Sequence, residues 1–503
     1  MKLHEAQRAT NPRNVTLALL IATFLSAIDG TIVSTAMPRI VSDLGGIQLI
    51  SWVVSVYLLT TTVSTPIYGK LADLFGRKPV FFVGAIVFLA GSMLSGLSQT
   101  MGQLIGFRAL QGLGAGALLP ITYTIVGDIY PFEQRARVQG WISGVWGVAG
   151  LVGPLVGGLL VDHASWRWVF YLNLPFGVAA LVVLAASLHE EIATTRRHID
   201  YWGALVFTIS MSCLLYALTQ GGTTYPWSSP VILGLFGVTA ALLTVFVGIE
   251  ARSPEPMMPL RLFTLPTIAL SNLSSALVSA VVVALSFYLP LWIQGVHGRG
   301  ATFSGLALAP MSVTWSLGSI LAGQVLPRIG IRVTALLGVA ITVLGCAGVA
   351  LLAVSTPAWL LIVFIAVLGW GFGLIFTSFT VAVQSGVGRD LRGAALASNT
   401  FVRALGQTIG IAAFGTVLNT GIARYLTAHA TGVNLAGLGA DLNEIFDPER
   451  AQSFPAALVA SLRAALASSL HEVFLALLVI SVAALVVTIW LPRGKGAPAE
   501  AGD

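Results

Sequence analysis

Apolar segments long enough to cross a lipid bilayer recur almost from end to end of this chain of 503 residues. A helix needs about 20 mainly apolar residues to cross the hydrocarbon core. Hydrophobic residues make up 56% of the chain and charged residues only 9%, whereas soluble domains carry about 25% charged residues. The sequence therefore predicts a single all-α polytopic membrane protein without a separate soluble domain.

Fourteen spans are predicted, as two groups of six with two inserted helices between them. They are expected over residues 15–37, 49–68, 79–98, 102–125, 138–160, 167–188, 200–219, 230–249, 267–291, 302–324, 331–353, 357–381, 394–418 and 470–491. The corresponding regions are an N-terminus (1–14), a first bundle (15–190), an inserted pair with linkers (191–265), a second bundle (266–491) with an external loop (419–469), and a tail (492–503).

Basic residues are distributed unevenly between the two sides of these spans. With the N-terminus inside, 18 of the 26 Lys and Arg residues lie in cytoplasmic segments and six in external ones, while Arg108 and Arg403 fall within spans. Because cytoplasmic loops are rich in Lys and Arg, both termini are predicted to be cytoplasmic. The basic residues stand singly or in pairs, so the net charge of +6 does not indicate a nucleic-acid partner.

Motifs for cofactors and for hydrolysis of nucleotides are missing from the sequence. Cys213 and Cys346 fall within apolar runs and lie outside any metal-ligand spacing. The segment GLGAG lies within an apolar helix without a preceding strand, so it does not qualify as a nucleotide fingerprint. No cofactor or metal is therefore expected, and an ion gradient would supply energy.

A short charged loop, GKLADLFGRK (Gly69–Lys78), separates the second and third spans and returns later as GQVLPRIGIR (Gly323–Arg332). Glycines 69 and 76 and the basic residue at 78 return at one constant offset as Gly323, Gly330 and Arg332. The repeat predicts two related halves with a path between them, which is an arrangement typical of transporters.

The acid in the first loop has a mechanical interpretation. Asp73 can pair with Arg77 or reach across to Arg135 or Arg137, and Asp128 is a candidate third member. Such pairing would latch the cytoplasmic side, with Gly69 and Gly76 allowing tight turns. The alternative is a solvated loop, which would explain the charges of Arg77 and Lys78 but not Asp73. Pro327 replaces the acid in the second loop, so the ionic part of the latch is predicted in the first half only.

The fifth span carries closely spaced small residues in GLVGPLVGG, at Gly150, Gly153, Gly157 and Gly158. Small residues at this spacing let two helices touch backbone to backbone. Pro154 removes a helical hydrogen bond and can bend the helix. The alternative interpretation is a generic tight-packing helix.

Asp29 and Arg108 are the deepest ionisable residues of the first bundle. A charge near the bilayer centre costs roughly 2.5–3.5 kcal/mol, so such a group needs a partner or a water-filled cavity. Asp29 is the candidate proton switch with Arg108 as counter-ion, and Asp128 the reserve candidate; a static Asp29–Arg108 pair is the alternative. Arg403, in the thirteenth span, is expected to face a substrate cavity or to snorkel.

Aromatic residues are the other candidates for lining that cavity, although most aromatic residues in such a protein face lipid or core. The candidates are Trp52, Tyr57, Tyr123, Trp146, Phe287, Tyr288, Trp292, Trp315 and Phe376. An apolar, aromatic cavity with one acidic group suits amphipathic or cationic compounds.

Five segments resemble the motifs of one family, the fourteen-helix drug:proton antiporters of the major facilitator superfamily. AIDGTIVSTAMP (Ala27–Pro38) resembles its first-helix signature, GKLADLFGRK its loop motif, LIGFRALQGLGAG (Leu104–Gly116) its fourth-helix motif and GLVGPLVGG its fifth-helix antiporter motif. WRWVFYLNLPFG (Trp166–Gly177) resembles a further block of this branch. The resemblance implies that the fifth helix packs across the interface between the bundles and limits leakage.

The expected function is proton-driven efflux of amphipathic or cationic drugs by alternating access, in a bacterial inner membrane. A dedicated exporter of one metabolite or lipid on the same scaffold remains the alternative. A membrane-embedded lipid enzyme or a passive channel would need a polar catalytic cluster or a symmetric polar pore, and neither is visible in the sequence.

Overall fold

The computed structural model describes residues 10–45, 49–190, 200–222, 224–299, 301–429 and 456–493. These residues are almost entirely helical. The helices are α1 (Pro12–Leu44), α2 (Ile50–Phe75), α3 (Arg77–Leu97), α4 (Met101–Ile129), α5 (Phe132–His163), α6 (Trp168–Tyr171), α7 (Asn173–Ser187), α8 (Tyr201–Gln220), α9 (Pro230–Glu250), α10 (Arg261–Thr264), α11 (Pro266–Leu291), η2 (Trp292–Val296), α12 (Ala301–Ile329), α13 (Ile331–Ala350), α14 (Ala358–Ser385), η3 (Arg389–Leu391), α15 (Arg392–His429) and α16 (Ala456–Ile489).

Each predicted span coincides with a helix of the fold. Within the described ranges, thirteen helical segments are long and apolar enough to cross a membrane. The fourteenth predicted span is α2, whose 26 residues include the polar run TTTVST at 60–65. The all-α membrane fold with about fourteen spans is thus confirmed.

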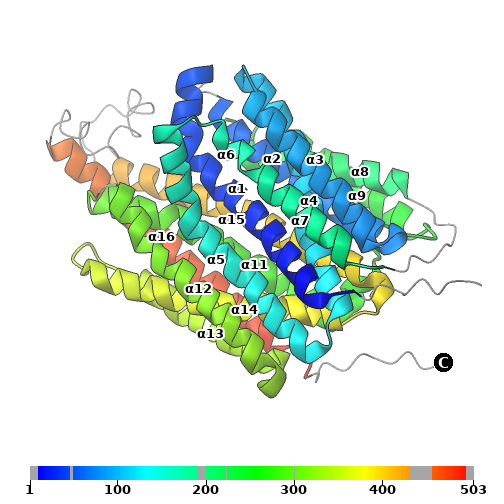
Figure 1. Cartoon of the computed structure of the whole chain (residues 1–503). Coiled ribbons are helices and arrows are strands. Elements are labelled where there is room, and N and C mark those ends of the chain that lie inside the picture. Colours follow the sequence, from blue (N-terminus) through cyan, green and yellow to red (C-terminus); the bar gives the residue numbers. More distant parts are fainter. Residues whose placement is uncertain are drawn as a thin grey trace, which may run out of the picture.

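The helices form two bundles with separate apolar cores (Figure 1). The first bundle contains α1 to α7, and its cores gather around residues such as Phe81, Phe88 and Phe170. The second contains α11 to α16, with Phe372, Phe379 and Phe474 in its core. The bundles meet where α2 packs against α15 and α5 against α12.

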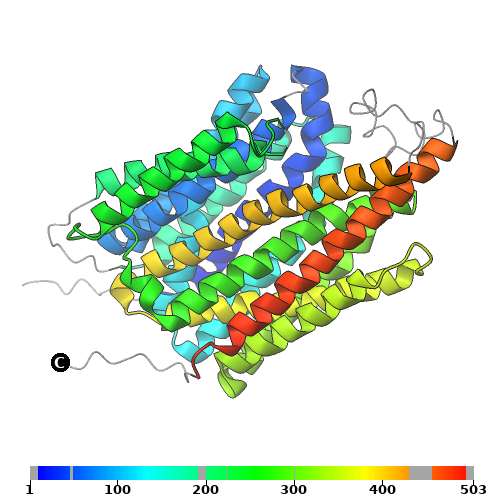
Figure 2. The same ribbon diagram turned by 180° about the vertical axis from the view of Figure 1, so that it is seen from behind.

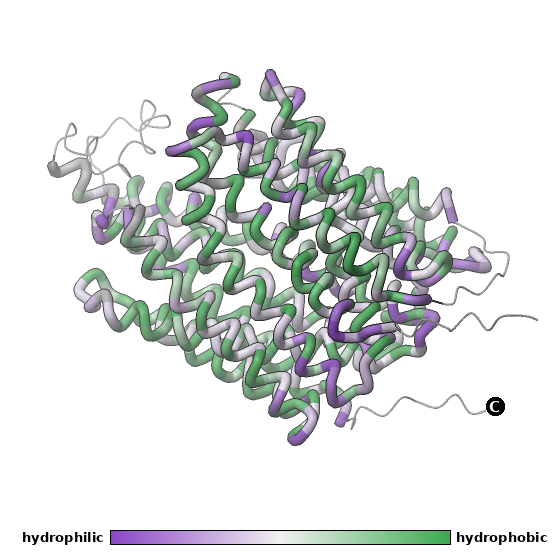
Figure 3. The backbone as a smooth tube through the Cα atoms, viewed as in Figure 1, coloured by the Kyte–Doolittle hydropathy of each residue, from purple (hydrophilic) through white to green (hydrophobic). Residues whose placement is uncertain are grey.

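Polar residues gather at the two ends of the bundles, while the helix centres are mainly apolar (Figure 3). The turns between α2 and α3, α4 and α5, and α12 and α13 lie at one end, together with the start of α1 and the end of α16. We call this end, which carries Gly69–Lys78, the loop-motif end.

The inserted helices α8 and α9 pack on each other along the side of the molecule where α2 and α15 meet (Figure 2). Their shared cluster contains Val63 of α2, Phe207 of α8 and Phe401 of α15, with the rings of Phe207 and Phe401 5.2 Å apart. Beyond α9, Glu255 forms an ion pair of 2.7 Å with Lys70 of α2. The inserted pair therefore contacts both bundles.

The predicted external loop at 419–469 is too wide. α15 continues to His429 and α16 begins at Ala456, so the described parts of this segment are helical. An exposed ion pair joins Arg424, in the extension of α15, to Glu472 of α16. Residues 430–455, the first nine residues and residues 494–503 lie outside the described part.

Candidate functional site

The two loop motifs adopt the same backbone turn. Gly76 has φ of 93° and Gly330 has φ of 86°. Side chains rarely adopt this left-handed region, so glycine is required at both turns. The repeat seen in the sequence is therefore a repeat of structure.

The first glycine of each motif lies where the two bundles touch. A Cβ atom at Gly69 would lie 2.8 Å from the carbonyl oxygen of Gly393 in α15, and one at Gly323 would lie 2.6 Å from that of Ala136 in α5. Contacts this short leave no room for a side chain. Each motif therefore holds one close crossing of the bundles near the loop-motif end.

Asp73 joins the bundles by binding the start of α15. Its carboxylate accepts hydrogen bonds from the backbone N–H groups of Gly393 (3.0 Å) and Ala394 (2.8 Å). A carboxylate at a helix N-terminus satisfies unpaired N–H groups and complements the helix dipole. Arg77 lies 3.1 Å from the same carboxylate.

Asp128, at the end of α4, is the second acid of this network. Arg77 approaches it to 2.9 Å and Arg392 of α15 forms an ion pair with it. Arg392 also donates to the Gly127 carbonyl (2.7 Å), and Arg77 to that of Arg389 (2.6 Å). We call Asp73, Arg77, Asp128 and Arg392 the ionic gate, because their buried charges join α2, α3 and α4 to α15.

The gate agrees in part with the predicted latch. The Asp73–Arg77 pair is present, and Asp128 is the third member of the latch. Asp128, also the reserve candidate for the proton switch, is not part of the cluster around Asp29. Of the alternative partners predicted for Asp73, the structure pairs it with Arg77 and not with Arg135 or Arg137; Arg135 donates instead to the Tyr130 carbonyl (2.7 Å). Within the described ranges, no ion pair involves the basic residues of the second loop, as the replacement by Pro327 predicts.

Two residues that form contacts at the loop-motif end were not predicted from the sequence. Arg392 was counted only as a loop residue, although its place before the thirteenth span in GRDLRG was a usable signal. Glu190 accepts hydrogen bonds of 2.9 Å from the N–H groups of both Arg77 and Lys78 at the start of α3. The Lys78 amine donates to the carbonyls of Ala185 and Leu188 at the end of α7.

Asp29 lies fully buried in the first bundle, where α1, α4 and α7 meet. Its carboxylate pairs with Arg108 at 2.7 Å and accepts hydrogen bonds from the side-chain amides of Gln111 (2.8 Å) and Asn173 (3.0 Å). A buried charge is tolerated when it is paired and hydrogen-bonded. In this conformation the Asp29 charge is therefore fully compensated.

Arg108 is held by the same cluster. It donates to the Gln111 side chain at 2.7 Å, and its guanidinium lies 4.0 Å from the ring centre of Tyr57. Gln111 and Asn173 were not singled out in the sequence, although Gln111 follows Arg108 by one helical turn and both lie in the motifs quoted above.

Arg403 is a partly buried arginine that lies between the bundles. The Arg403 guanidinium of α15 stacks at 4.1 Å on the ring of Phe376 of α14, and the Tyr123 hydroxyl of α4 is its hydrogen-bonding partner. Trp315 of α12 stacks on the other side of this cluster, with its ring 5.3 Å from that of Phe376. The structure thus brings together four of the predicted cavity residues, which we call the Arg403 cluster.

The remaining predicted cavity residues lie elsewhere. Trp52 packs on Tyr216 of α8, and Tyr288 is buried in the core of the second bundle. Trp146 and Phe287 are exposed and, within the described ranges, make no ring contact with the Arg403 cluster. Their spacing in the sequence gave no indication of which face of each helix meets the other bundle.

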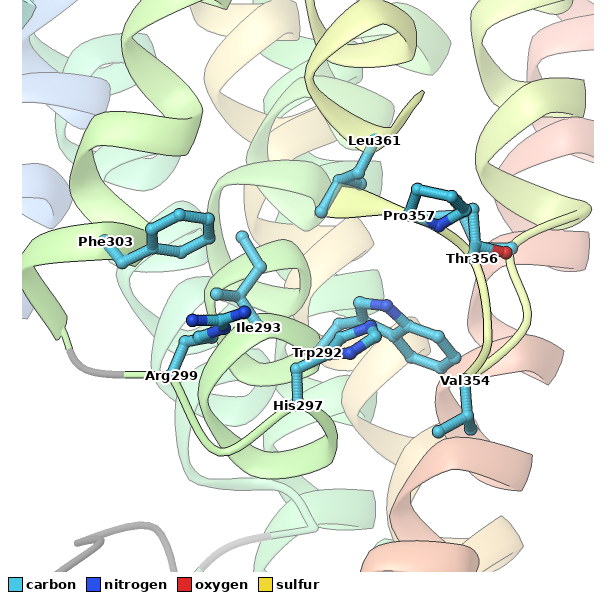
Figure 4. Close-up of a pocket in the computed structure, with 10 residues that line it drawn as sticks. Trp292, Ile293, His297, Arg299, Phe303, Val354, Thr356, Pro357 and Leu361 are labelled. Carbon is cyan, nitrogen blue, oxygen red and sulfur yellow. The ribbon is translucent and has the colours of Figure 1, made fainter. Parts of the chain in front are cut away.

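Trp292 belongs to a different pocket, of about 230 Å³, at the end opposite the loop motifs (Figure 4). The pocket lies within the second bundle, between η2, the start of α12 and the turn before α14, and includes His297, Arg299 and Phe303. Burial and the nearby charge of Arg299 lower the pKa of His297.

The fifth-span glycines divide between two partners. Towards the loop-motif end of α5, Gly140 and Gly147 touch α12, and a Cβ atom at Gly150 would lie 3.3 Å from the Ser312 hydroxyl of the same helix. Gly153 instead packs on Thr31 of α1, within its own bundle, and Gly158 faces open space. The implied packing across the interface therefore covers the first part of the motif and not Gly153.

The two remaining residues of the GLVGPLVGG motif do not show which helix they pack against. Gly157 is buried, and Pro154 lies within the continuous helix α5, with its side chain outside the described part.

Contacts between the bundles are closest at the loop-motif end. The ionic gate, the Gly69 and Gly323 crossings, and a hydrogen bond of 2.8 Å from Gln384 of α14 to the Tyr123 carbonyl of α4 all lie there. The helix ends of the two bundles spread apart at the opposite end (Figures 1 and 2).

Comparison with known proteins shows which family the chain resembles. The family model described as Major Facilitator Superfamily matches residues 19–411. The chain is 34% identical to the Multidrug transporter protein MdtP of Bacillus subtilis, over all of this chain and 97% of that protein. It is 36% identical to Multidrug resistance protein 3 of the same organism, covering 96% of this chain and 95% of that protein.

Solved structures show the same fold at much lower identity. The proton:xylose symporter XylE superposes with a TM-score of 0.64 at 13% identity, covering 97% of both chains. The human organic anion transporter MFSD10 superposes with a TM-score of 0.62 at 13% identity, covering 94% of this chain and all of that one.

Proposed function

The chain belongs to the Major Facilitator Superfamily, and on this basis we propose that it is a proton-driven efflux antiporter for small amphipathic compounds in a bacterial cell membrane. Relatives of nearly the same length are named as multidrug transporters. The proposed energy source is the proton gradient, without a cofactor. The observation that carries the proposal is a buried carboxylate, Asp29, held by groups from three helices of one bundle.

Asp29 is suited to couple protons to movement because its charge is compensated by partners on other helices. Protonation would remove the negative charge that holds Arg108. The Asp29 carboxyl group would then carry an O–H donor, so the side-chain amides of Gln111 and Asn173 would lose their best hydrogen-bond acceptor. These residues belong to α4 and α7. A change of protonation would therefore alter contacts among α1, α4 and α7.

The ionic gate supplies the second element that alternating access needs, a closure that can open. We place the loop-motif end and both termini in the cytoplasm, since the basic loops gather there. The conformation described above is then closed on the cytoplasmic side. Opening the cytoplasmic side requires Asp73 to leave the N-terminus of α15 and Asp128 to leave Arg392.

The cationic substrate class rested on Asp29 being an available acid. With Asp29 fully paired to Arg108, Gln111 and Asn173, this conformation gives that class no support. The amphipathic class is supported by the aromatic side chains at Arg403. A dedicated exporter of one metabolite or lipid remains the alternative, because the same gate and carboxylate would serve it.

Transport in proteoliposomes tests the proposal. We expect a pH gradient, acidic outside, to drive uphill export of amphipathic probes that share a naphthalene ring and carry a negative, a positive or no charge. A protonophore should abolish this export. Replacing Asp29 by Asn should remove uphill movement while leaving downhill exchange. Gradient-independent export by the wild-type protein would contradict proton coupling, and export of a single compound from a broad panel would favour the dedicated exporter.

A further inference from the structure

Arg403 differs from the other deep arginine in having no acidic partner among the described residues. Arg108 and Arg403 both stack on an aromatic ring, at 4.0 and 4.1 Å, but only Arg108 forms an ion pair, with Asp29. Over the ranges that the structure describes, no carboxylate lies within ion-pair distance of Arg403. Its partners are the neutral hydroxyl of Tyr123 and the face of Phe376.

An unpaired guanidinium at this depth is costly for the protein. Arg403 lies eleven residues beyond Arg392, so at 1.5 Å per residue it stands about 16 Å along α15, roughly half the thickness of a bilayer core. Charged side chains at such depth pair with one another or mark a substrate pathway. Because the described chain supplies no counter-charge, the anion is expected to come from outside the protein.

The position of Arg403 is that of a substrate site in an alternating-access transporter. Tyr123 belongs to α4 of the first bundle, whereas Phe376 and Arg403 belong to α14 and α15 of the second. The carbonyl of Tyr123 accepts the Gln384 hydrogen bond at the closed end of the interface. The cluster therefore lies between the bundles, just inside the closure, where a bound molecule would touch both.

We propose that Arg403 binds the acidic group of the substrate, so that the protein prefers amphipathic anions with an aromatic or apolar body. The guanidinium would donate charge-assisted hydrogen bonds to a carboxylate or sulfonate. Trp315, which is partly exposed and stacks on the buried ring of Phe376 at an angle of 16° between their planes, provides an aromatic surface for the body of that molecule. This inference rests on the proposed function, since it names the substrate class of the same transporter.

Three probes with one ring system separate charge from shape: 2-naphthalenesulfonate, 2-naphthyltrimethylammonium and 2-naphthalenemethanol. Binding to the purified full-length protein is measured by equilibrium dialysis. We expect the sulfonate to bind at least roughly tenfold more tightly than the ammonium, the size of one charge-assisted hydrogen bond. Equal or tighter binding of the ammonium overturns the inference.

Substitutions at Arg403 test whether that preference comes from this side chain. R403Q should lose the preference for the sulfonate while keeping affinity for the neutral probe, and R403K should keep most of it. The control is R424Q, which removes an exposed arginine from the same helix and should change nothing. If R403Q lowers Tm and weakens all three probes alike, Arg403 is only a structural contact and the inference fails.

Transport separates this inference from the proposed function. Gradient-driven export of the probes without a preference for the sulfonate would leave the antiporter standing and remove the anion site. Arg403-dependent binding of the sulfonate without gradient-driven export of any probe would keep the anion site and contradict the proposed antiporter.

Discussion

At the scale of residues, the buried carboxylates of Asp29 and Asp73 are satisfied in different ways. Asp29 is neutralised within its own bundle by Arg108, whereas Asp73 is satisfied chiefly by backbone N–H groups of the other bundle. Loss of the first charge leaves a cation buried, and loss of the second releases a helix end. Substitutions at the two positions should therefore fail differently.

Asp29→Asn should lower both stability and coupling. Removing one partner of a buried ion pair costs about 3–5 kcal/mol, because Arg108 is left unpaired. The double variant D29N/R108Q removes both charges, so its Tm should recover while uphill export stays lost. Thermal unfolding and gradient-driven export measured on the same preparations check this. A double variant no more stable than D29N would show that Arg108 is stabilised by its other contacts.

Asp73→Asn should open the loop-motif end without unfolding the protein. The neutral amide loses the attraction to Arg77 and to the α15 dipole but keeps the size of the side chain. Spin labels at the exposed positions Gln134 and Asp390, one on each bundle, should show a longer distance in the variant. The matched control is E472Q, which breaks an exposed pair at the opposite end and should leave that distance unchanged.

At the scale of elements, helix positions followed from the sequence far better than helix faces did. Spans such as 230–249 and 331–353 match α9 and α13 closely, because lipid demands a continuous apolar helix. The turn glycines at 76 and 330 also followed, since only a repeat of backbone geometry explains their offset. The facing of Trp146, Trp292 and Gly153 did not follow, because almost every side of a membrane helix is apolar.

The same reasoning explains what the sequence revealed of the site. Asp29, Arg108 and Asp73 were found because a charge in or beside a span is conspicuous. Gln111 and Asn173 were not, since a neutral amide carries no formal charge, although its burial also requires hydrogen-bonding partners. The use of α15 backbone N–H groups by Asp73 has no side-chain signature at all.

Gly140→Val should separate α5 from α12. A Cβ atom at Gly140 would lie 2.5 Å from the Ser319 carbonyl oxygen, too close to be accommodated without moving a backbone. We expect increased proton leak through proteoliposomes and a longer label distance across the interface. Gly158→Val is the matched control, because Gly158 faces open space on the same helix. Equal leak in both variants would mean that α5 packing does not seal the interface.

Gly153→Leu has a different expected outcome, because Gly153 packs on Thr31 of α1 inside the first bundle. The clash should reduce thermal stability more than it increases leak, which reverses the expectation drawn from the motif alone. Comparison of Tm and leak with those of Gly140→Val checks the distinction. A leaky variant of unchanged Tm would return Gly153 to the interface between the bundles.

At the scale of the whole molecule, alternating access requires the bundles to move as bodies about crossings that are tight at one end. The inserted pair contacts both bundles through α8, which packs on α2 and on α15, so it must follow or resist that movement. The close crossings of α2 with α15 and α5 with α12 are the pair that must separate at the loop-motif end. Fixing one crossing should therefore arrest the cycle.

A disulfide between cysteines at 144 and 316 tests this movement. A Cβ atom built at Gly144 lies 3.9 Å from the Cβ atom of Ser316, within the range of about 3.5–4.5 Å found in disulfides. In a background with Cys213 and Cys346 replaced by Ala, oxidation of G144C/S316C should stop uphill export, and reduction should restore it. Each single cysteine variant should be unaffected by oxidant. Undiminished export by fully oxidised protein would mean that α5 and α12 stay together at this point throughout transport, so the cytoplasmic side would have to open by their separation nearer the loop-motif end, at Gly323, or by separation of α2 from α15.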